Sequence, residues 1–215
     1  MTDKKNIVIV GAGFAGIYAA KKLANKLNKK EYQIVLVDKH SFMTYLTEIH
    51  EVATNRVEPD HVQEDLQTLF HKSPNVKLLT AEVKKVDAKN KIIKTNQGEL
   101  PYEKLVIAAG GESNDFNTPG VKQYGFELWS FEQSLKLKEH INQVITDASL
   151  EADPDKRKAM LTIAIVGSGF TGVELAGELI EYRKVLALEN KIDENEIKLI
   201  ILEASPSILN MLSDR

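Results

Sequence analysis

The chain has 215 residues, of which 43% are apolar and 27% are charged, and its formal net charge is −3. These values are typical of a soluble globular protein of one or two domains, and they offer no basic surface for nucleic acid. The sequence contains no cysteine, which excludes disulfides, thiolate metal sites and a dithiol relay within the chain.

The sequence shows no pattern typical of a membrane span, a signal peptide or a metal site. No run of about 18 apolar residues is present, so no membrane-spanning helix is expected. The first residues, MTDKKN, lead directly into an apolar strand and leave no room for a signal peptide, which favours an intracellular location. The five histidines are scattered, so we expect no metal site.

The N-terminal residues are predicted to form a complete βαβ unit. The apolar run Ile7–Val10 predicts a buried parallel strand, and Gly11–Gly16 forms the turn after it. Apolar residues then recur at helical spacing as far as Leu27. A second apolar strand, Ile34–Val37, ends at Asp38, and the crossover between the two strands should be right-handed.

Shorter elements are predicted in the middle of the chain. His40–Asn55 should be a loop or a short helix, and Pro59 should open an amphipathic helix that ends at Ser73. Polar turns separate the strands that follow. The predicted strands are Val76–Leu79, Ala81–Val86, Lys91–Thr95 and the buried strand Leu105–Ala109.

A stretch rich in Gly, Asn, Ser and Pro, Glu112–Gly125, marks a domain boundary. After it, a capping box that begins at Ser130 should start a helix running to about Ala148. Glu151–Lys158 is then expected to be a charged linker.

The opening pattern returns in the last third of the sequence. The strand Leu161–Val166, the turn Gly167–Gly172, an amphipathic helix and the strand Ile197–Leu202 predict a second βαβ unit. A mononucleotide-binding half needs further strands, so this second domain looks truncated at Arg215. We therefore predict an α/β fold with two Rossmann-like dinucleotide-binding domains, in residues 1–115 and 116–215.

The first turn matches the pattern G-x-G-x-x-G between a strand and a helix. Its first glycine makes the tight turn, its second lets the backbone approach a pyrophosphate, and its third lets the helix pack on the strand. A carboxylate at Asp38 can accept hydrogen bonds from an adenosine ribose. The residues of the turn are Gly11, Ala12, Gly13, Phe14, Ala15 and Gly16.

The second turn repeats the pattern with Gly167, Gly169 and Gly172, and Glu203 closes the strand that follows. A carboxylate at that position favours a free 2′-hydroxyl and repels a 2′-phosphate, which favours NADH over NADPH. The alternative is an ordinary surface carboxylate at a strand end. Two dinucleotide turns in one chain suggest a flavoprotein that takes electrons from a nicotinamide nucleotide.

Two other groups of residues are open to two interpretations. Glu174, in the predicted first turn of the second crossover helix, lies near the expected nicotinamide, but an acid there also complements the helix dipole. Thr47, Glu48, His50 and Glu51 lie in a region that can pass a flavin ring. From sequence alone, a capped surface helix is the favoured interpretation of that region.

With these residues in view, the chain resembles the two-dinucleotide-binding flavoproteins, the superfamily of the disulfide reductases and their relatives. Within it, the chain is most similar to the type II NADH dehydrogenases, the single-subunit, non-pumping NADH:quinone oxidoreductases. The segments that carry the resemblance are VGAGFAG, TYLTEIHEVA, TAEVKKVD, LVIAAGG, GSGFTGVELAGEL and LIILEASPSIL.

The resemblance implies a set of cofactor contacts. For FAD, Gly11–Ala15 and the Asp38-Lys39 pair would hold the pyrophosphate and ribose, and Val83 would meet the adenine end. Thr47 would lie near the flavin ring, with Gly110 also at the FAD site.

For NADH, the resemblance assigns the nucleotide to the second glycine turn and Glu203. Glu174 matches the family's acid at the nicotinamide–flavin junction, with a role in proton transfer or hydride positioning. The electrons would pass through the flavin to a membrane quinone. A homodimer that docks peripherally on the cytoplasmic side of the cell membrane is also implied.

The sequence departs from the superfamily at several points. Ala109 stands where the superfamily often has Thr, and the segment HSFMTYLTEIH lacks the two redox cysteines of the disulfide reductases. The later Gly-Asp segment of the FAD site, the quinone pocket and the C-terminal membrane helices are not in this sequence. Two alternatives therefore remain: a non-catalytic nucleotide-binding fragment, and a cysteine-free NADH:ferredoxin-type reductase.

Overall fold

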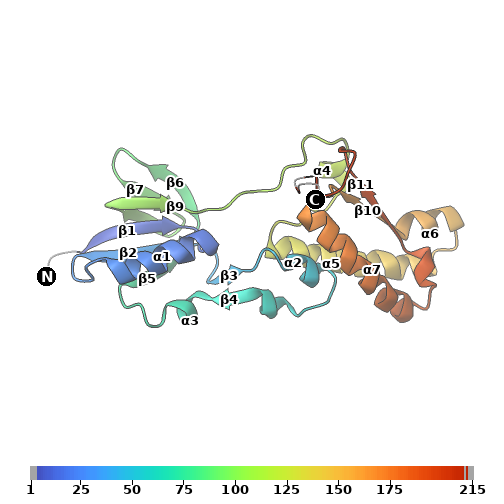
Figure 1. The fold of residues 1–215 in the computed structure, drawn as a ribbon, viewed down its shortest axis with the longest axis horizontal. Helices are drawn as coiled ribbons and strands as arrows, with labels where there is room; N and C mark the ends of the chain where they lie inside the picture. The colour runs from blue at the N-terminus through green and yellow to red at the C-terminus, as the bar shows by residue number, and fades with distance from the viewer. Residues whose placement is uncertain (1–3, 211, 213–215) are drawn as a thin grey trace. The chain divides into compact units, whose positions relative to one another are not determined.

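The computed structural model describes residues 4–210 and residue 212, and these form two compact units (Figure 1). Among the described residues, unit 1 contains residues 4–44 and 63–111. Unit 2 contains residues 45–62, 112–210 and 212. Residues 45–62 thus belong to unit 2 although they lie within the first 115 residues. Among the described residues, no helix is both long enough and apolar enough to cross a bilayer.

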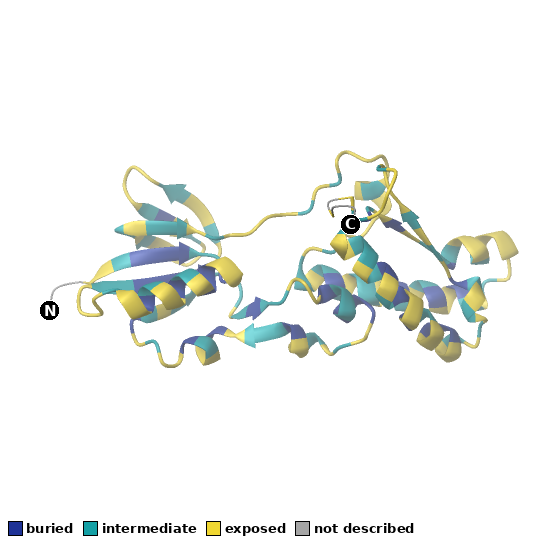
Figure 2. Cartoon of the chain, viewed as in Figure 1, coloured by how far each residue is buried: buried dark blue, intermediate teal, exposed yellow. Residues whose placement is uncertain are grey.

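Unit 1 is built on a parallel four-stranded sheet in the order β5-β2-β1-β9. The two central strands are the apolar runs expected from the sequence, and Figure 2 shows them as the dark blue, buried part of this sheet. The first βαβ unit is therefore confirmed. Its elements are β1 (Lys5–Val10), α1 (Phe14–Lys26) and β2 (Tyr32–Asp38), with β5 (Val76–Thr80) and β9 (Lys104–Ile107) on either side.

The strand expected to be buried near Leu105 is only half-buried. It is β9, which lies at one edge of the sheet and pairs with β1 alone. The side chain of Ile107 is 67% exposed as a result. An apolar run does not by itself distinguish a central strand from an edge strand.

The prediction of a single helix after Pro59 is wrong. A 3₁₀ turn, η1 (Pro59–Val62), leads into β4 (Gln63–Asp65), which pairs with β3 (Phe42–Thr44). The side chain of Asp65 then accepts a hydrogen bond from the main-chain N–H of Thr68 and caps the short helix α3 (Leu66–Phe70). Pairing with a distant strand overrides the helical spacing of the apolar residues here.

An antiparallel three-stranded sheet completes unit 1. Two of its strands follow the prediction closely, whereas β8 was not predicted from the sequence. The strands are β6 (Val83–Asp87), β7 (Ile92–Thr95) and β8 (Gly98–Pro101).

Unit 2 contains the second βαβ unit, which is also confirmed. The strands β10 (Thr162–Val166) and β11 (Lys198–Leu202) pair in parallel, and α7 (Phe170–Asn190) connects them. The core lies between this unit and α5 (Phe131–Leu150). Its most buried members include Ile145, Leu161, Leu179, Leu186 and Ile197, and the short elements α4 (Val121–Tyr124) and η2 (Glu194–Glu196) complete the unit.

The prediction of a charged linker at residues 151–158 is wrong, because the helix α6 (Pro154–Met160) begins within this segment. The side chain of Asp153 accepts hydrogen bonds from two main-chain N–H groups of its first turn, and Pro154 occupies the first helical position. Arg157 anchors the helix by pairing with Glu196 and donating to the carbonyl of Ala148.

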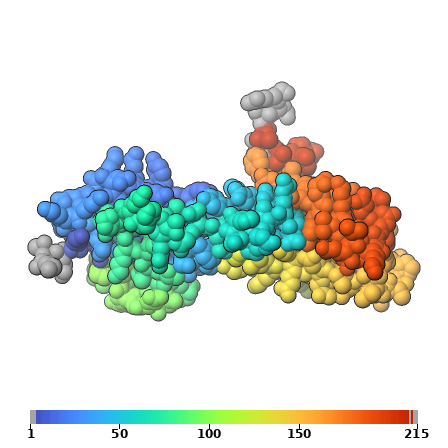
Figure 3. All heavy atoms as spheres, turned by 90° about the horizontal axis from the view of Figure 1, so that it is seen from below, coloured from blue at the N-terminus to red at the C-terminus, as the bar shows by residue number. Residues whose placement is uncertain are grey.

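The short helix allowed for residues 40–55 is present, but the interpretation of Thr47, Glu48, His50 and Glu51 as a capped surface helix is wrong. The helix α2 (Ile49–Ala53) buries Ile49, Val52 and Ala53 and contacts both α5 and α7 within unit 2. Figure 3 shows the cyan atoms of this segment against the yellow and orange atoms of those helices. The side chain of Glu48 makes no capping hydrogen bond. Apolar packing, not capping, therefore holds α2 in place.

Two glycines of α7 provide a test of the helix–turn packing. A Cβ at Gly172 would lie 2.1 Å from the carbonyl oxygen of Gly167, whereas a Cβ at Gly177 would meet nothing within 4 Å. We predict that Gly172→Ala destabilises the protein by about 1–3 kcal/mol through overpacking. We predict that the matched variant Gly177→Ala stabilises it by about 0.5–1 kcal/mol, because alanine favours a helix interior.

Thermal or urea unfolding of the two variants measures both effects. Equal stability changes in the two alanine variants would contradict the close contact between the start of α7 and its glycine turn.

Candidate functional site

The first glycine turn is tight at both ends and open in its middle. Gly11 has φ +99°, and a Cβ there would lie 2.2 Å from the carbonyl oxygen of Ala108. A Cβ at Gly16 would lie 1.8 Å from the carbonyl oxygen of Gly11. At Gly13 a Cβ would meet nothing within 4 Å. The turn therefore leaves open the position at which a pyrophosphate would approach the backbone.

The helices that follow the two turns begin without a side-chain capping hydrogen bond. Gly13 caps α1 and Gly169 caps α7, and neither cap is a side-chain hydrogen bond. Neither helix has an acidic residue in its first turn. No acid within the first turn of either helix offsets the partial positive charge of its N-terminus, which suits a phosphate group.

Asp38 connects the first turn to the end of β2. Its Oδ2 accepts a hydrogen bond from the main-chain N–H of Ala12 at 2.7 Å, and its Oδ1 accepts one from the main-chain N–H of His40 at 2.9 Å. A carboxylate offers about four acceptor positions. Asp38 can therefore hold the turn and still accept a hydrogen bond from a ribose hydroxyl.

Glu203 plays the same part in unit 2 and is held more firmly. Its Oε2 accepts hydrogen bonds from the main-chain N–H of Ser168 at 2.8 Å and from the Ser168 hydroxyl at 2.6 Å. Its Oε1 accepts one from the main-chain N–H of Ser205 at 2.8 Å. The Ser168 hydroxyl, followed by the N–H groups of Ser205 and Ser168, lowers the pKa of the Glu203 carboxyl to about 2.

The second turn has the backbone of the first. Gly167 has φ +98°, which favours glycine, and Gly172 packs closely on its carbonyl oxygen. The hydroxyl of Ser168 was not singled out from the sequence. A serine between two glycines of such a turn gives no sign of whether its side chain points to solvent or to the strand end.

The remaining residues expected to contact FAD fall in both units. Lys39 is exposed just after β2, Val83 is the half-buried first residue of β6, and Gly110 is exposed after β9 with φ +77°. All three belong to unit 1, with the first glycine turn and Asp38. Thr47 is exposed in the turn before α2 and belongs to unit 2.

Glu174 lies one residue beyond the first turn of α7, because the helix begins at Phe170 and its first turn contains no acid. The expectation that it lies in the first turn is therefore wrong, and a helix-dipole role loses its basis, since that effect falls off within one turn. The Glu174 side chain is 48% exposed, and its Oε2 lies 4.0 Å from Nδ1 of His50.

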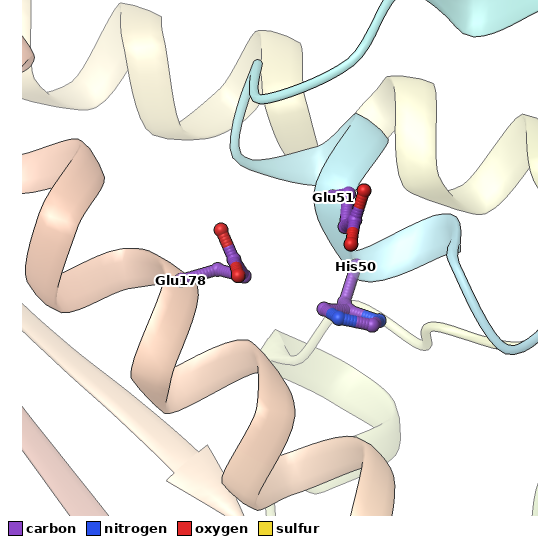
Figure 4. A group of neighbouring side chains, drawn as sticks. All are labelled: His50, Glu51 and Glu178. Atoms are coloured by element: carbon purple, nitrogen blue, oxygen red, sulfur yellow. The ribbon is translucent and has the colours of Figure 1, made fainter. Parts of the chain in front are cut away.

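His50 also belongs to a polar cluster that joins α2 to α7. Figure 4 shows His50 and Glu51 on α2 and Glu178 on α7, and their potential ligand atoms lie within 4.8 Å of one another. Three such groups could hold a metal ion, which no sequence pattern indicated. However, Arg56 pairs directly with Glu178, and this contact raises the pKa of the guanidinium. The arginine already supplies the positive charge that a metal would bring.

Comparisons with known proteins agree with this geometry. The family model described as pyridine nucleotide-disulphide oxidoreductase matches residues 5–215. The type II NADH:quinone oxidoreductase of Staphylococcus haemolyticus is 34% identical over 212 residues, which are 99% of this chain and 52% of that protein. Its counterpart in Staphylococcus aureus strain NCTC 8325 is 31% identical over the same shares of each chain. The chain thus spans about half the length of the curated relatives it matches.

Solved structures share the fold. NDH2 of Plasmodium falciparum, determined in complex with NADH, superposes with a TM-score of 0.85 and 23% identity, covering 98% of this chain and 44% of that one. The sulfide:quinone oxidoreductase of Aquifex aeolicus gives a TM-score of 0.67 at 20% identity, and the match covers 87% of this chain and 42% of that one. The predicted Rossmann-type fold and the resemblance to type II NADH:quinone oxidoreductases are confirmed.

The hydrogen bonds to Glu203 predict how stability depends on pH. Its folded pKa is about 2, below the ordinary value of 4.5, so the ionised carboxylate stabilises the fold above about pH 4.5. That contribution should be lost progressively as the pH falls from 4.5 through 2. We predict that the stability difference between wild type and Glu203→Gln is constant near neutral pH and shrinks below pH 4.5. Urea unfolding between pH 6 and pH 3 measures it, and a pH-independent difference would contradict this account.

Proposed function

The chain belongs to the pyridine nucleotide-disulphide oxidoreductase family, and from this we propose that unit 1 binds FAD, unit 2 binds NADH, and both serve an NADH:quinone oxidoreductase. One observation carries the proposal. Each unit has a glycine turn tied by a main-chain hydrogen bond to a carboxylate at the end of the next strand, Asp38 in one and Glu203 in the other. Each turn leads into a helix whose N-terminus has no acid in its first turn.

In unit 1, the open backbone at Gly13 and the N-terminus of α1 bind the pyrophosphate of FAD. Asp38 accepts a hydrogen bond from the ribose with the acceptor capacity that Ala12 and His40 leave. Lys39, Val83 and Gly110 contribute further contacts from the same unit. When bound, FAD would supply the redox chemistry of the site, that is, the capacity to accept a hydride and to release two electrons.

In unit 2, the turn from Gly167 to Gly172 and the N-terminus of α7 bind the pyrophosphate of NADH. Glu203 accepts a hydrogen bond from the ribose 2′-hydroxyl. Because its pKa is about 2, the carboxyl is ionised at neutral pH and repels the 2′-phosphate of NADPH.

Glu174 is the residue to which we assign a part in turnover. Its half-exposed carboxylate can orient the nicotinamide or exchange a proton with solvent, and the His50 imidazole at 4.0 Å is a nearby proton-exchanging group. No side chain needs to act as a nucleophile, because the chain has no cysteine and the cofactors carry the redox steps.

The proposed electron acceptor rests on the names of the relatives, and the proposed assembly rests on the family resemblance of the sequence. The curated relatives are named for quinone, so we propose a membrane quinone as acceptor. We further propose a homodimer that works at the cytoplasmic side of the cell membrane. A second candidate follows from the chain spanning about half of those relatives: a nucleotide-binding module that holds FAD and NADH without passing electrons to quinone.

Spectroscopy of the purified chain with FAD tests the proposal. We expect a yellow protein that retains FAD through gel filtration and loses its absorbance near 450 nm, about the position of the flavin band, when NADH is added anaerobically. Turnover with quinone added supports the oxidoreductase, whereas retained FAD that NADH does not bleach supports the binding module. A colourless protein that NADH does not alter would refute both, and ferredoxin in place of quinone tests the remaining acceptor.

For Glu174, we predict that Glu174→Gln slows reduction of the bound flavin by about 10-fold or more with the FAD content unchanged, because a positioned proton donor or acceptor is lost. Stopped-flow absorbance measures the rate. Glu189→Gln, the same substitution at an exposed position of α7, is the matched control and should reduce its flavin at the normal rate. A Glu174→Gln protein as fast as that control would remove Glu174 from the mechanism.

A further inference from the structure

The two glycine turns differ by one hydroxyl group at the position after their first glycine. Ala12 occupies it in unit 1 and Ser168 in unit 2. Both residues donate their main-chain N–H to the carboxylate at the strand end, at 2.7 Å and 2.8 Å. Only Ser168 adds a side-chain donor, and its hydroxyl lies 2.6 Å from Oε2 of Glu203. The carboxylate of unit 2 is therefore held by one contact that unit 1 lacks.

The Ser168 side chain is placed to act on Glu203 and not on a ligand. Ser168 is 2% exposed, whereas Glu203 is exposed. The main-chain carbonyl of Ser168 also accepts a hydrogen bond from the N–H of Leu209 at 3.0 Å, which fixes the residue from its other side. A buried hydroxyl in this position can transmit its effect only through the carboxylate that it holds.

The acceptor positions of Glu203 show what the hydroxyl achieves. Oε2 accepts two hydrogen bonds, both from Ser168, and Oε1 accepts one from Ser205. A carboxylate has about four acceptor positions, so Oε2 is filled and the capacity left for a ligand lies on Oε1. Asp38 of unit 1 has two positions filled and two left, one on each oxygen. Glu203 thus presents a single acceptor in a fixed orientation, which matches one hydroxyl donor.

We propose that Ser168 is a positioning residue that sets the nucleotide preference of unit 2, by holding Glu203 so that it accepts one ribose hydroxyl and cannot turn away from a 2′-phosphate. This inference rests on the proposed NADH site. With the serine in place, a dianionic 2′-phosphate meets a fixed negative charge. Without the hydroxyl, two main-chain donors remain and the carboxylate is freer to rotate away, so the phosphate is repelled less.

The charge state of Glu203 supports the same role. The Ser168 hydroxyl is the largest cause of the lowered pKa of the Glu203 carboxyl. Loss of that hydroxyl should raise the pKa towards its ordinary value. This effect depends on the protein alone and can be measured without a nucleotide.

Dissociation constants for NADH and NADPH test the proposal in wild type and in Ser168→Ala. We expect the preference for NADH over NADPH to fall by about 10-fold in Ser168→Ala, the size expected for one hydrogen bond to a charged group. Ser134→Ala is the matched control, because Ser134 is also fully buried in unit 2 but donates its hydroxyl to the carbonyl of Phe131. Its preference should equal that of wild type.

A double-mutant cycle shows whether Ser168 acts through Glu203. Glu203→Ala should weaken NADH binding and relax the preference, and Ser168→Ala added to it should change the preference no further. The proposal would be overturned if Ser168→Ala reduced the preference for NADH over NADPH equally with Glu203 present and with Glu203 replaced by alanine. So would an unchanged preference in Ser168→Ala.

Carbon-13 NMR of the Glu203 carboxyl separates this inference from the proposed function. A higher pKa of that carboxyl in Ser168→Ala than in wild type supports the positioning role, and an unchanged pKa overturns it. Wild-type protein that binds neither nucleotide would refute the NADH site, and the selectivity inference with it. If the protein binds NADH tightly but Ser168→Ala does not change its preference for NADH over NADPH, the role of Ser168 is refuted and the proposed NADH site is not.

Discussion

In both units, the main-chain N–H after the first glycine donates a hydrogen bond to the carboxylate that ends the next parallel strand. The contacts are Ala12 to Asp38 and Ser168 to Glu203. Each fixes the turn against the end of its sheet and so sets where the following helix begins. In the proposed function, the turn backbone, the helix N-terminus and the carboxylate would face one ligand together. The same side chain would then fix the turn and accept a hydrogen bond from a ribose, because a carboxylate has enough acceptor positions for both tasks.

Local patterns predicted the elements that this interaction organises. The strand–turn–helix–strand order is encoded within a few dozen residues, and glycine spacing together with apolar runs identifies it. Predictions failed where a distant partner decides the structure. Residues Gln63–Asp65 have helical spacing in the sequence but form a strand, because they pair with β3. The apolar face of α2 is buried because it packs against α5 and α7. Charge alone suggested a linker at α6, although Asp153 and Pro154 are good helix-start residues.

Side-chain detail at the site was less predictable than the backbone. Glu203 was found because it ends a strand, whereas the hydroxyl that holds it required the structure. Glu174 was found by its position in the sequence, but its neighbour His50 lies more than a hundred residues away along the chain and reaches it only because α2 packs on α7. The same packing brings Arg56 to Glu178, with which it forms an ion pair. Long-range neighbours of this kind leave no local signal.

The assignment of one nucleotide to each unit is the claim on which the functional account rests. It is tested most directly by NMR of the main-chain amides of Gly13 and Gly169, which cap α1 and α7, during separate titrations with FAD and NADH. The account predicts that FAD shifts the Gly13 amide and NADH shifts the Gly169 amide. A single turn that responds to both nucleotides, or no response in either turn, would contradict it.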